Sequence, residues 1–394
     1  MAFDKMIVKK LLKKFDDVPF VVKFPDGEEF KVGEGEPQAI IRANGGIDMG
    51  AVMKSPSLAL GEAYMDKTLE LEKGDLFEIL NMVLAKLEDF ASDFSGLTKI
   101  MKTSTSKKNQ KQEIATHYDI GNEFFELWLD ETMSYSCGYF KHETDTLYDA
   151  QVHKVEHILK KLNLKEGQTL LDIGCGWGYL LIAAAKKYHV KGVGITLSEE
   201  QYKKGQERIK AEGLEGQVGI RLMDYRDLEK SGMTFDRIVS VGMLEHVSRD
   251  NYPLFFKNID KVLNKKGIVL LHYISGRQEH DGDPWIKKYI FPGGIIPSLR
   301  EIIYLIGEYN YYTLDVESLR RHYEKTLLEW SKNYAAKRDV IDTMFEERFV
   351  RMWELYLVSC ASVFHNGICD IHQILFTKGV DNDLPMTRNY LYED

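Results

Sequence analysis

Short apolar runs alternate with helical segments along the chain from about residue 114 onward. This alternation predicts a parallel β-sheet with helices on both faces, and therefore an α/β fold. The last two runs flank a long helical stretch over about residues 316–368. We expect this stretch to form a lid, because such sheets bind ligands beyond the carboxyl ends of their strands. In chain order, the runs are TLLDIGCG, VKGVGITL, GIRLMD, FDRIVSVGML, GIVLLHYI, YYTLDV and IHQILFTKG.

The first 97 residues have a different pattern of apolar and polar positions, which predicts a small N-terminal α+β domain. Residues 1–16 form an amphipathic pattern with lysines opposite one apolar face. Two interpretations stay open for this helix: docking on its own domain, or lying in a membrane interface. VVKFPDGEEFKVG predicts a β-hairpin, and residues 58–94 predict helices. The apolar face consists of Met6, Ile7, Leu11, Leu12 and Phe15.

Residues 98–113, TKIMKTSTSKKNQKQE, are polar and basic, which is typical of a linker. A positive stretch of this kind suits a position near lipid headgroups. We expect residues 114–380 to form the main domain and residues 381–394 a C-terminal tail.

Composition narrows the classes of function. The 394 residues are 44% apolar and 29% charged, as in globular proteins of two or three domains. A net charge of −9 disfavours binding to nucleic acid over a broad face. The four cysteines show no CxxC spacing, which indicates a reduced, cytoplasmic setting. No segment has the roughly 20 apolar residues that a membrane span needs, and the N-terminus is too charged for a signal peptide. If the protein handles lipid, we expect it to do so from the membrane surface or in a pocket.

The sharpest motif is a GxGxG turn between an apolar strand and a helix. It is preceded by Asp172 and contains Gly174, Gly176 and Gly178. Glycines permit a tight turn and close approach of a ligand, while the helix N-terminus supplies N–H groups for an anion such as a carboxylate. The spacing differs from the GxGxxG of dinucleotide sites. It resembles the class I S-adenosylmethionine-dependent methyltransferases; a glycine-rich turn without a ligand is the alternative.

The tips of the next two strands offer further ligand contacts. The second strand lacks the carboxylate that usually holds the ribose, so we expect Thr196 or Gln201 to bond the diol instead. After the third strand, Asp224 suits the adenine amino group and Tyr225 suits stacking on the ring. A helix N-cap is the alternative for Asp224.

Several motifs in order resemble a narrower family, the cyclopropane-fatty-acyl-phospholipid synthases and mycolic acid cyclopropane synthases. The resemblance covers about residues 114–380, and SPSLALGEAYMDKTLELEKGD looks like the extra N-terminal domain of the phospholipid enzymes. The motifs are TLSEEQ, His117–Asn122, Met133–Cys137, Met243–Val247, Phe291–Gly294, His322–Leu327 and Tyr356–Cys360.

The resemblance implies a class I methyltransferase fold with a seven-stranded sheet and a helical lid. It implies transfer of a methylene group from S-adenosylmethionine to a cis double bond of an acyl chain in a membrane phospholipid. A bound bicarbonate then deprotonates the carbocation to close a cyclopropane ring. It also implies a cytoplasmic homodimer that associates peripherally with the inner face of the membrane.

Site residues follow from the same resemblance. The bicarbonate cage maps to the backbone of Cys137 and Ile274 and the side chains of Glu245, His272 and Tyr323. Cys360 matches the family's active-site cysteine. The cofactor contacts map to Tyr118, Tyr135, Ser136, Gly174, Gly176, Thr196, Leu197, Gln201, Asp224 and Tyr225.

The chemistry explains why such residues are needed. An alkene attacks a sulfonium methyl only when held in line, and the resulting cation survives only without water. Ring closure needs a small base that is held by hydrogen-bond donors.

Structural roles stay open for His272, Glu245, Tyr323 and Cys360. Glu245 with His246 and His272, and His280–Asp283, match no metal-ligand spacing, so we expect no metal.

Two other classes of function stay open. One is a methyltransferase of the same fold that acts on a different substrate or methylates a fatty acyl chain without ring closure. The other is a lipid-binding or scaffolding protein without catalysis.

Overall fold

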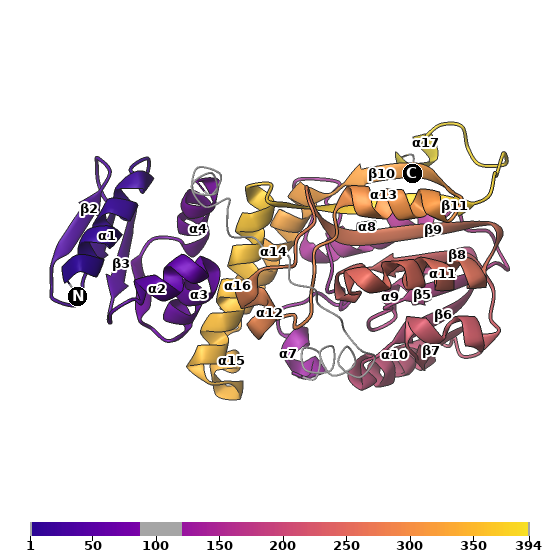
Figure 1. The fold of residues 1–394 in the computed structure, drawn as a ribbon. Coiled ribbons are helices and arrows are strands. Elements are labelled where there is room, and N and C mark those ends of the chain that lie inside the picture. Colours follow the sequence, from indigo (N-terminus) through magenta and orange to yellow (C-terminus); the bar gives the residue numbers. More distant parts are fainter. Residues whose placement is uncertain (1, 87–119, 393–394) are drawn as a thin grey trace. The chain divides into compact units, whose positions relative to one another are not determined.

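The computed structural model describes residues 2–86 and 120–392 (Figure 1). The chain divides into two compact units. The first consists of Met1–Met101, Asp283–Ile290 and Trp330–Gly367. The second consists of Lys102–Gly282, Phe291–Glu329 and Ile368–Asp394.

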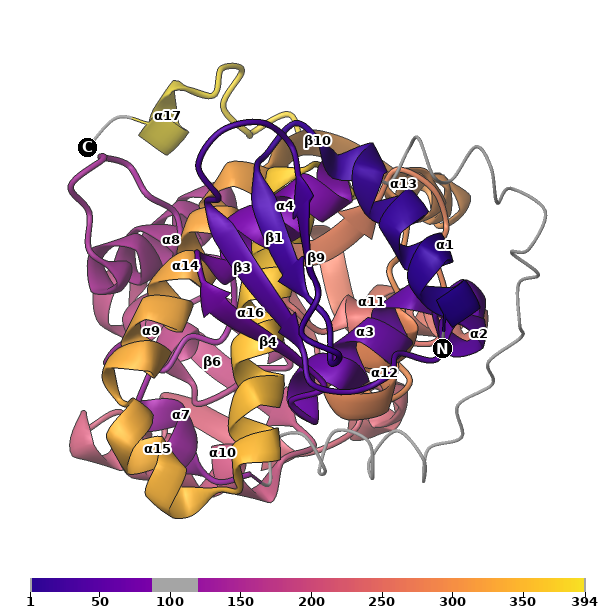
Figure 2. The same ribbon diagram turned by 90° about the vertical axis from the view of Figure 1, so that its left-hand side faces the viewer.

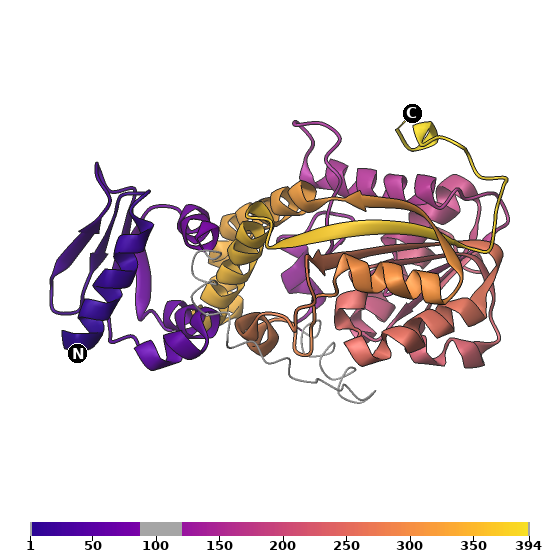
Figure 3. The same ribbon diagram turned by 45° about the horizontal axis from the view of Figure 1, so that its top comes forward.

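A seven-stranded sheet forms the centre of the second unit, with the strand order β10-β11-β9-β8-β5-β6-β7. The five strands from β5 to β9 are parallel, whereas β11 runs antiparallel to β9 and β10 antiparallel to β11 (Figure 3, where β11 is the long yellow strand). All seven predicted runs are therefore strands of one sheet. Their bounds are β5 Thr169–Ile173, β6 Lys191–Thr196, β7 Val218–Leu222, β8 Phe235–Val241, β9 Leu263–Gly276, β10 Tyr311–Ser318 and β11 Cys369–Lys378.

Helices cover both faces of this sheet, as predicted. Leu170 and Leu270 pack with α8 and α9 on one face, while Leu171 and Leu271 pack with α11 and α13 on the other. The central strands are rich in apolar residues because both of their faces are buried. The helices are α7 Asn122–Glu126, α8 Leu147–Lys161, α9 Tyr179–Tyr188, α10 Glu199–Ala211, α11 Tyr252–Val262, α13 Leu299–Glu308 and α17 Asn389–Tyr392. Short 3₁₀ turns are η2 Tyr225–Asp227, η3 Glu229–Ser231, η4 Leu244–His246 and η5 Arg249–Asn251.

Local capping fixes where these helices begin. Thr146 and Asp149 form a reciprocal capping box at the start of α8, and Ser298 and Glu301 form another at the start of α13. Each box satisfies backbone N–H groups that the first helical turn leaves without partners.

The first unit contains a four-stranded sheet with the order β2-β1-β3-β4 (Figure 2, indigo to violet). The predicted hairpin is confirmed, because β1 and β2 pair antiparallel around a turn in which Gly27 has φ = 85°. The strands are β1 Phe20–Lys23, β2 Glu29–Val32, β3 Ala39–Ala43 and β4 Leu69–Lys73. The helices are α1 Ala2–Leu12, η1 Lys13–Phe15, α2 Met49–Lys54, α3 Pro56–Met65, α4 Leu76–Ala85, α12 Pro284–Tyr289, α15 Arg338–Met344 and α16 Glu347–His365.

The helical prediction for residues 58–94 is wrong in its middle. Strand β4 separates α3 from α4 and pairs antiparallel with β3, which was also not predicted. The sequence of β4, LELEK, alternates with a period of two, which suits a half-exposed strand better than a helix. Residues 87–94 lie outside the described residues.

The amphipathic helix α1 docks on its own unit. Lys5 pairs with Asp26 at 2.5 Å, and Lys9 pairs with Glu28. Leu12 of α1 packs against the small core of this sheet. In the structure, α1 therefore takes the docked arrangement.

The long stretch predicted as a lid is helical. Helix α14 (Arg320–Ala336) begins in the second unit, and α15 and α16 belong to the first. Its action as a lid stays a prediction. Within the described ranges, no helix combines the length and apolar character needed to cross a bilayer.

Candidate active site

The glycine-rich turn adopts the backbone conformation that the motif predicts. Gly174, Gly176 and Gly178 have φ of 82°, 53° and 82°. A Cβ on Gly174 would lie 2.9 Å from Cγ of Met243, so a side chain there meets both strain and a clash. Gly174 N donates to Ile195 O at 2.9 Å, which holds the turn against the end of β6.

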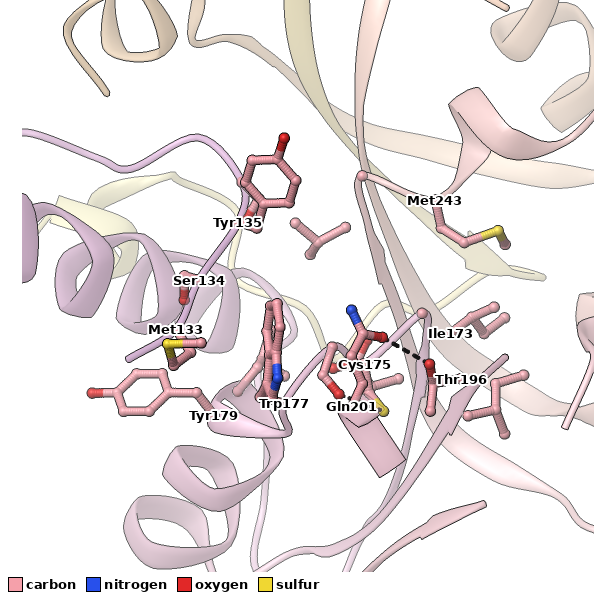
Figure 4. A pocket seen from close by; sticks show the side chains of 18 of the residues that line it. Met133, Ser134, Tyr135, Ile173, Cys175, Trp177, Tyr179, Thr196, Gln201 and Met243 are labelled. Carbon is pink, nitrogen blue, oxygen red and sulfur yellow. Dashed lines mark hydrogen bonds between the residues drawn. The ribbon is translucent and has the colours of Figure 1, made fainter. Parts of the chain in front are cut away.

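A pocket opens at this turn, beyond the carboxyl ends of β5, β6 and β8 (Figure 4). This is the edge at which doubly wound sheets bind ligands. Nine of the predicted cofactor residues line it: Tyr135, Ser136, Asp172, Gly174, Gly176, Thr196, Leu197, Gln201 and Tyr225.

Thr196 and Gln201 lie together on one wall of the pocket (Figure 4). Thr196 Oγ1 accepts from Ser198 N at 3.1 Å and donates to Gln201 Oε1 at 2.8 Å. Because the amide oxygen is bonded to Thr196, the amide nitrogen is oriented to donate to a ligand. This arrangement suits a sugar hydroxyl, as the sequence predicts.

Two described residues among the predicted cofactor contacts, Asp224 and Gly178, are not in the pocket lining. Asp224 caps η2, accepts from Arg226 N at 2.9 Å and is paired with the Arg226 guanidinium at 2.6 Å. These bonds match the capping alternative, so contact with adenine stays a prediction. Gly178 is the N-cap of α9. Tyr118 lies outside the described residues.

Glu245 lies in η4, in the turn that follows β8. Its Oε1 accepts from Ile274 N at 2.7 Å, while Oε2 is buried with no partner among the described residues. Burial raises the pKa of Glu245 to about 7, and the Ile274 N–H opposes that shift. The carboxyl can therefore hold or release a proton near neutral pH.

His272 lies on β9, two residues before Ile274 and so on the same face of the strand. Its ring is 1% exposed, and Nδ1 lies 3.2 Å from Gln373 Nε2. No partner lies near His272 Nε2 in the described part of the chain. Burial lowers the pKa of His272 well below its usual value, and Lys154 and Lys161 add to the shift.

Cys137 and Tyr323 approach the same carbonyl. Cys137 Sγ lies 3.9 Å from Leu319 O, and Tyr323 N donates to that oxygen at 3.1 Å. Burial raises the pKa of the Cys137 thiol, so it is not a thiolate at neutral pH. Both residues belong to the second unit, as do Glu245 and His272, whereas Cys360 lies half-buried on α16 of the first unit.

A comparison with known families now decides the classification. A family model described as "Mycolic acid cyclopropane synthetase" matches residues 105–374. The chain belongs to this family. A second model, described only as a domain of unknown function (DUF7884), matches residues 7–95.

Two relatives match nearly the whole chain and therefore include part of its N-terminal region. "Probable fatty acid methyltransferase" of Pseudomonas putida is 39% identical over 95% of this chain and 96% of its own. Cyclopropane-fatty-acyl-phospholipid synthase of Escherichia coli is 40% identical over 90% of this chain and 92% of its own. The structure of mycolic acid cyclopropane synthase CmaA1 with SAH and CTAB has a TM-score of 0.64 and 34% identity, and covers 68% of this chain and 98% of its own. The chain is therefore a cyclopropane synthase family enzyme with the class I S-adenosylmethionine-dependent methyltransferase fold.

Sequence reasoning missed some residues of this family member's pocket. Lys154, on α8, is 3% exposed, lines the pocket and donates to Ser136 Oγ at 2.8 Å. Burial lowers its pKa to about 8. Lys154 lies one helical turn from the buried Ile158. A lysine on the apolar face of a predicted helix is a sequence pattern that indicates a buried, functional lysine.

Aromatic residues of the pocket wall were also missed. Trp177 lines the pocket, and its ring lies 5.6 Å from that of Phe125. Tyr135 packs against Phe125 at 5.5 Å and against Trp128 at 5.4 Å. Tyr135 and Trp177 give the pocket an aromatic wall, and Phe125 packs against both of them (Figure 4 shows Tyr135 and Trp177).

Proposed function

We propose that this enzyme transfers a methylene group from S-adenosylmethionine to a cis double bond of an acyl chain in a membrane phospholipid, and closes a cyclopropane ring by deprotonation. The observation that carries the proposal is that two buried atoms, Glu245 Oε2 and His272 Nε2, have no hydrogen-bond partner among the described residues. Buried polar atoms are normally satisfied, so these two favour a small polar ligand. The name of the E. coli relative supports the phospholipid substrate.

The pocket supports the choice of carbon donor. The backbone of Gly174 and Gly176 lines the pocket, so a ligand can approach the turn closely, and Gln201 presents an oriented amide. Tyr135 and Trp177 present aromatic rings at the same pocket, and aromatic faces attract positive charge. When bound, S-adenosylmethionine would supply a methyl group on a sulfonium sulfur.

The cage residues fit bicarbonate in their chemistry, and when bound it would supply a small base. A protonated Glu245 can donate from Oε2, and a neutral His272 can donate or accept at Nε2. The Tyr323 hydroxyl and the Cys137 N–H complete the proposed set of donors. The Ile274 N–H holds Glu245, so in this proposal Ile274 acts by orienting that carboxyl. Cys360 keeps the active-site assignment that the family resemblance implies, but not as a nucleophile, because no step requires a thiolate.

The polar atoms assigned to the cage are shielded from water. His272 is 1% exposed, and Glu245 Oε2 is buried. A dry site protects a carbocation from addition of water, which would give an alcohol.

We further propose a homodimer that works at the cytoplasmic face of the membrane by peripheral association. Exposed lysines of the N-terminal segment, such as Lys10 and Lys13, supply positive charge that anionic headgroups attract.

The test is incubation of the full chain with methyl-labelled S-adenosylmethionine and vesicles of cis-unsaturated phospholipid. We expect label in an acyl chain that has lost its double bond and gained a three-membered ring. Vesicles of saturated phospholipid are the control and should take no label. Absence of label from both lipids would contradict the proposal.

A second candidate is methylation of the acyl chain without ring closure. It is favoured by the name of the Pseudomonas putida relative, which matches 95% of this chain. A methyl branch in the labelled product would support it.

A further inference from the structure

Three residues far apart in the sequence form a row across the sheet. Gln373 of β11 pairs with His272 of β9 on one side and with Glu317 of β10 on the other. Residues opposite each other on paired strands have side chains on the same face. Gln373 is 0% exposed and His272 is 1% exposed, so no solvent competes for their polar atoms.

The contact between Gln373 and His272 is directional. Gln373 Nε2 lies 3.2 Å from His272 Nδ1. An amide nitrogen carries two hydrogens and only donates, so the ring nitrogen that faces it must be the acceptor. A neutral imidazole has one N–H, which in this arrangement is on Nε2. That atom is the one buried without a partner in the described residues.

The groups around His272 favour the neutral ring. Lys154, His157 and Lys161 face it from α8, and Glu317 faces it from β10. Glu317 is already bonded to His157 Nε2 at 2.7 Å and to Lys161 Nζ at 2.5 Å. Its charge is therefore balanced locally, and burial keeps His272 without a second proton.

We propose that Gln373 is a positioning residue that holds His272 in the tautomer with the hydrogen on Nε2, which makes that atom a donor toward a small oxyanion. The role of the oxyanion rests on the proposed function, whereas the tautomer does not. The far nitrogen of a catalytic histidine commonly sets the ring's tautomer through its hydrogen-bond partner. Gln373 thereby determines whether the ring repels or binds an anion.

The first test reads the tautomer directly. The full chain with ¹⁵N-labelled histidine is compared by NMR with His272→Asn, which identifies the His272 signals among those of the 11 histidines. We expect a hydrogen bonded to Nε2 and none on Nδ1. A hydrogen on Nδ1 of the unsubstituted protein overturns the proposal. This readout requires neither substrate nor turnover.

The second test changes the partner. Gln373→Glu presents only acceptors when its carboxyl is ionised, so in spectra recorded at alkaline pH the hydrogen should move to Nδ1, and an unchanged tautomer under those conditions overturns the proposal. Gln373→Met keeps the length of the side chain without the hydrogen bond. We expect kcat of Gln373→Met to fall about 10- to 100-fold with an unchanged KM for S-adenosylmethionine. An unchanged kcat overturns the positioning role.

A matched control is available on the same strand and face. Thr377 is 1% exposed and also has a buried oxygen without a described partner. Thr377→Val should leave both the tautomer and kcat unchanged. Addition of bicarbonate alone should shift the His272 Nε2 signal in the unsubstituted protein but not in Gln373→Glu; an equal shift in both proteins overturns the donor role.

The outcomes separate this inference from the proposed function. If the product carries a methyl branch and no ring while His272 carries its hydrogen on Nε2, the proposed function fails and the tautomer assignment stands. If a ring forms while the hydrogen is on Nδ1, the proposed function stands and the tautomer assignment fails.

Discussion

The backbone N–H of Ile274 donates a 2.7 Å hydrogen bond to Glu245 Oε1, and so joins the end of β9 to the turn after β8. The bond fixes one carboxyl oxygen and leaves the other buried without a described partner. A carboxyl held in this way keeps its orientation whether or not it is ionised.

Replacement of Glu245 by Gln should abolish turnover while S-adenosylmethionine still binds. The amide keeps the shape of the side chain but cannot exchange a proton, and such a loss costs about 100-fold or more in rate. Calorimetric binding and initial rates are the measurements. Glu308→Gln, which removes an exposed carboxylate from α13, is the control. Equal loss of cofactor binding and turnover would contradict the role of Glu245 on the acyl side.

Glu245 should also make stability depend on pH. Its pKa is raised from 4.5 to about 7, so between these values the folded state binds more protons than the unfolded state. The free energy of unfolding should therefore fall as pH rises from 4.5 to 7, by up to about 3 kcal/mol for this group. Denaturant titrations at several pH values should show a shallower fall for Glu245→Gln than for Glu308→Gln. Parallel curves for the two variants would refute the shifted pKa.

Replacement of Gly174 by Ala should weaken S-adenosylmethionine binding at least tenfold. The new Cβ would meet the Met243 side chain at 2.9 Å in a backbone with φ = 82°. Gly232→Ala is the control, because Gly232 has φ = 68° but open space around it. Comparable weakening in both variants would show that backbone strain, not the pocket, is responsible.

Replacement of Thr196 by Val should raise the KM for S-adenosylmethionine by about fivefold, the worth of one neutral hydrogen bond. The variant loses the bond that orients the Gln201 amide. Steady-state kinetics measure the change, with the exposed Thr313→Val on β10 as the control. An unchanged KM would remove Gln201 from the proposed ribose contacts.

Membrane association predicts a dependence on the charge of the substrate surface. Lys10 and Lys13 are exposed, and each lysine near an anionic surface contributes about 1 kcal/mol. The double variant Lys10→Gln/Lys13→Gln should act more slowly on anionic vesicles and normally on detergent-dispersed lipid. Lys257→Gln/Lys261→Gln on α11 is the charge-matched control. Equal slowing by both double variants would contradict a specific role for the N-terminal lysines.

The parallel sheet could be predicted from sequence because each central strand is a short apolar run buried on both faces. The glycine turn was equally readable, since its conformation is local. Strand β4 was missed because LELEK is short, highly charged and flanked by helices. Its pairing with β3 comes from the tertiary fold, which overrides weak local preferences.

The site was only partly readable. The sequence predicts Asp224 as an adenine contact with a helix N-cap as the alternative, and the bonds from Asp224 to Arg226 in the same turn match that alternative. Gln373 was not considered, because its contact with His272 depends on strand register across a separation of 101 residues. Hydrogen bonds within a turn follow from spacing, whereas partners brought together by a sheet do not.

The most direct measurement of the central claim uses S-adenosylmethionine with a fully deuterated methyl group and vesicles of cis-unsaturated phospholipid. Ring closure removes one hydrogen from the transferred methyl. We predict an acyl product with a cyclopropane ring that retains two of the three deuteriums. A methyl-branched product that retains all three would contradict deprotonation and ring formation.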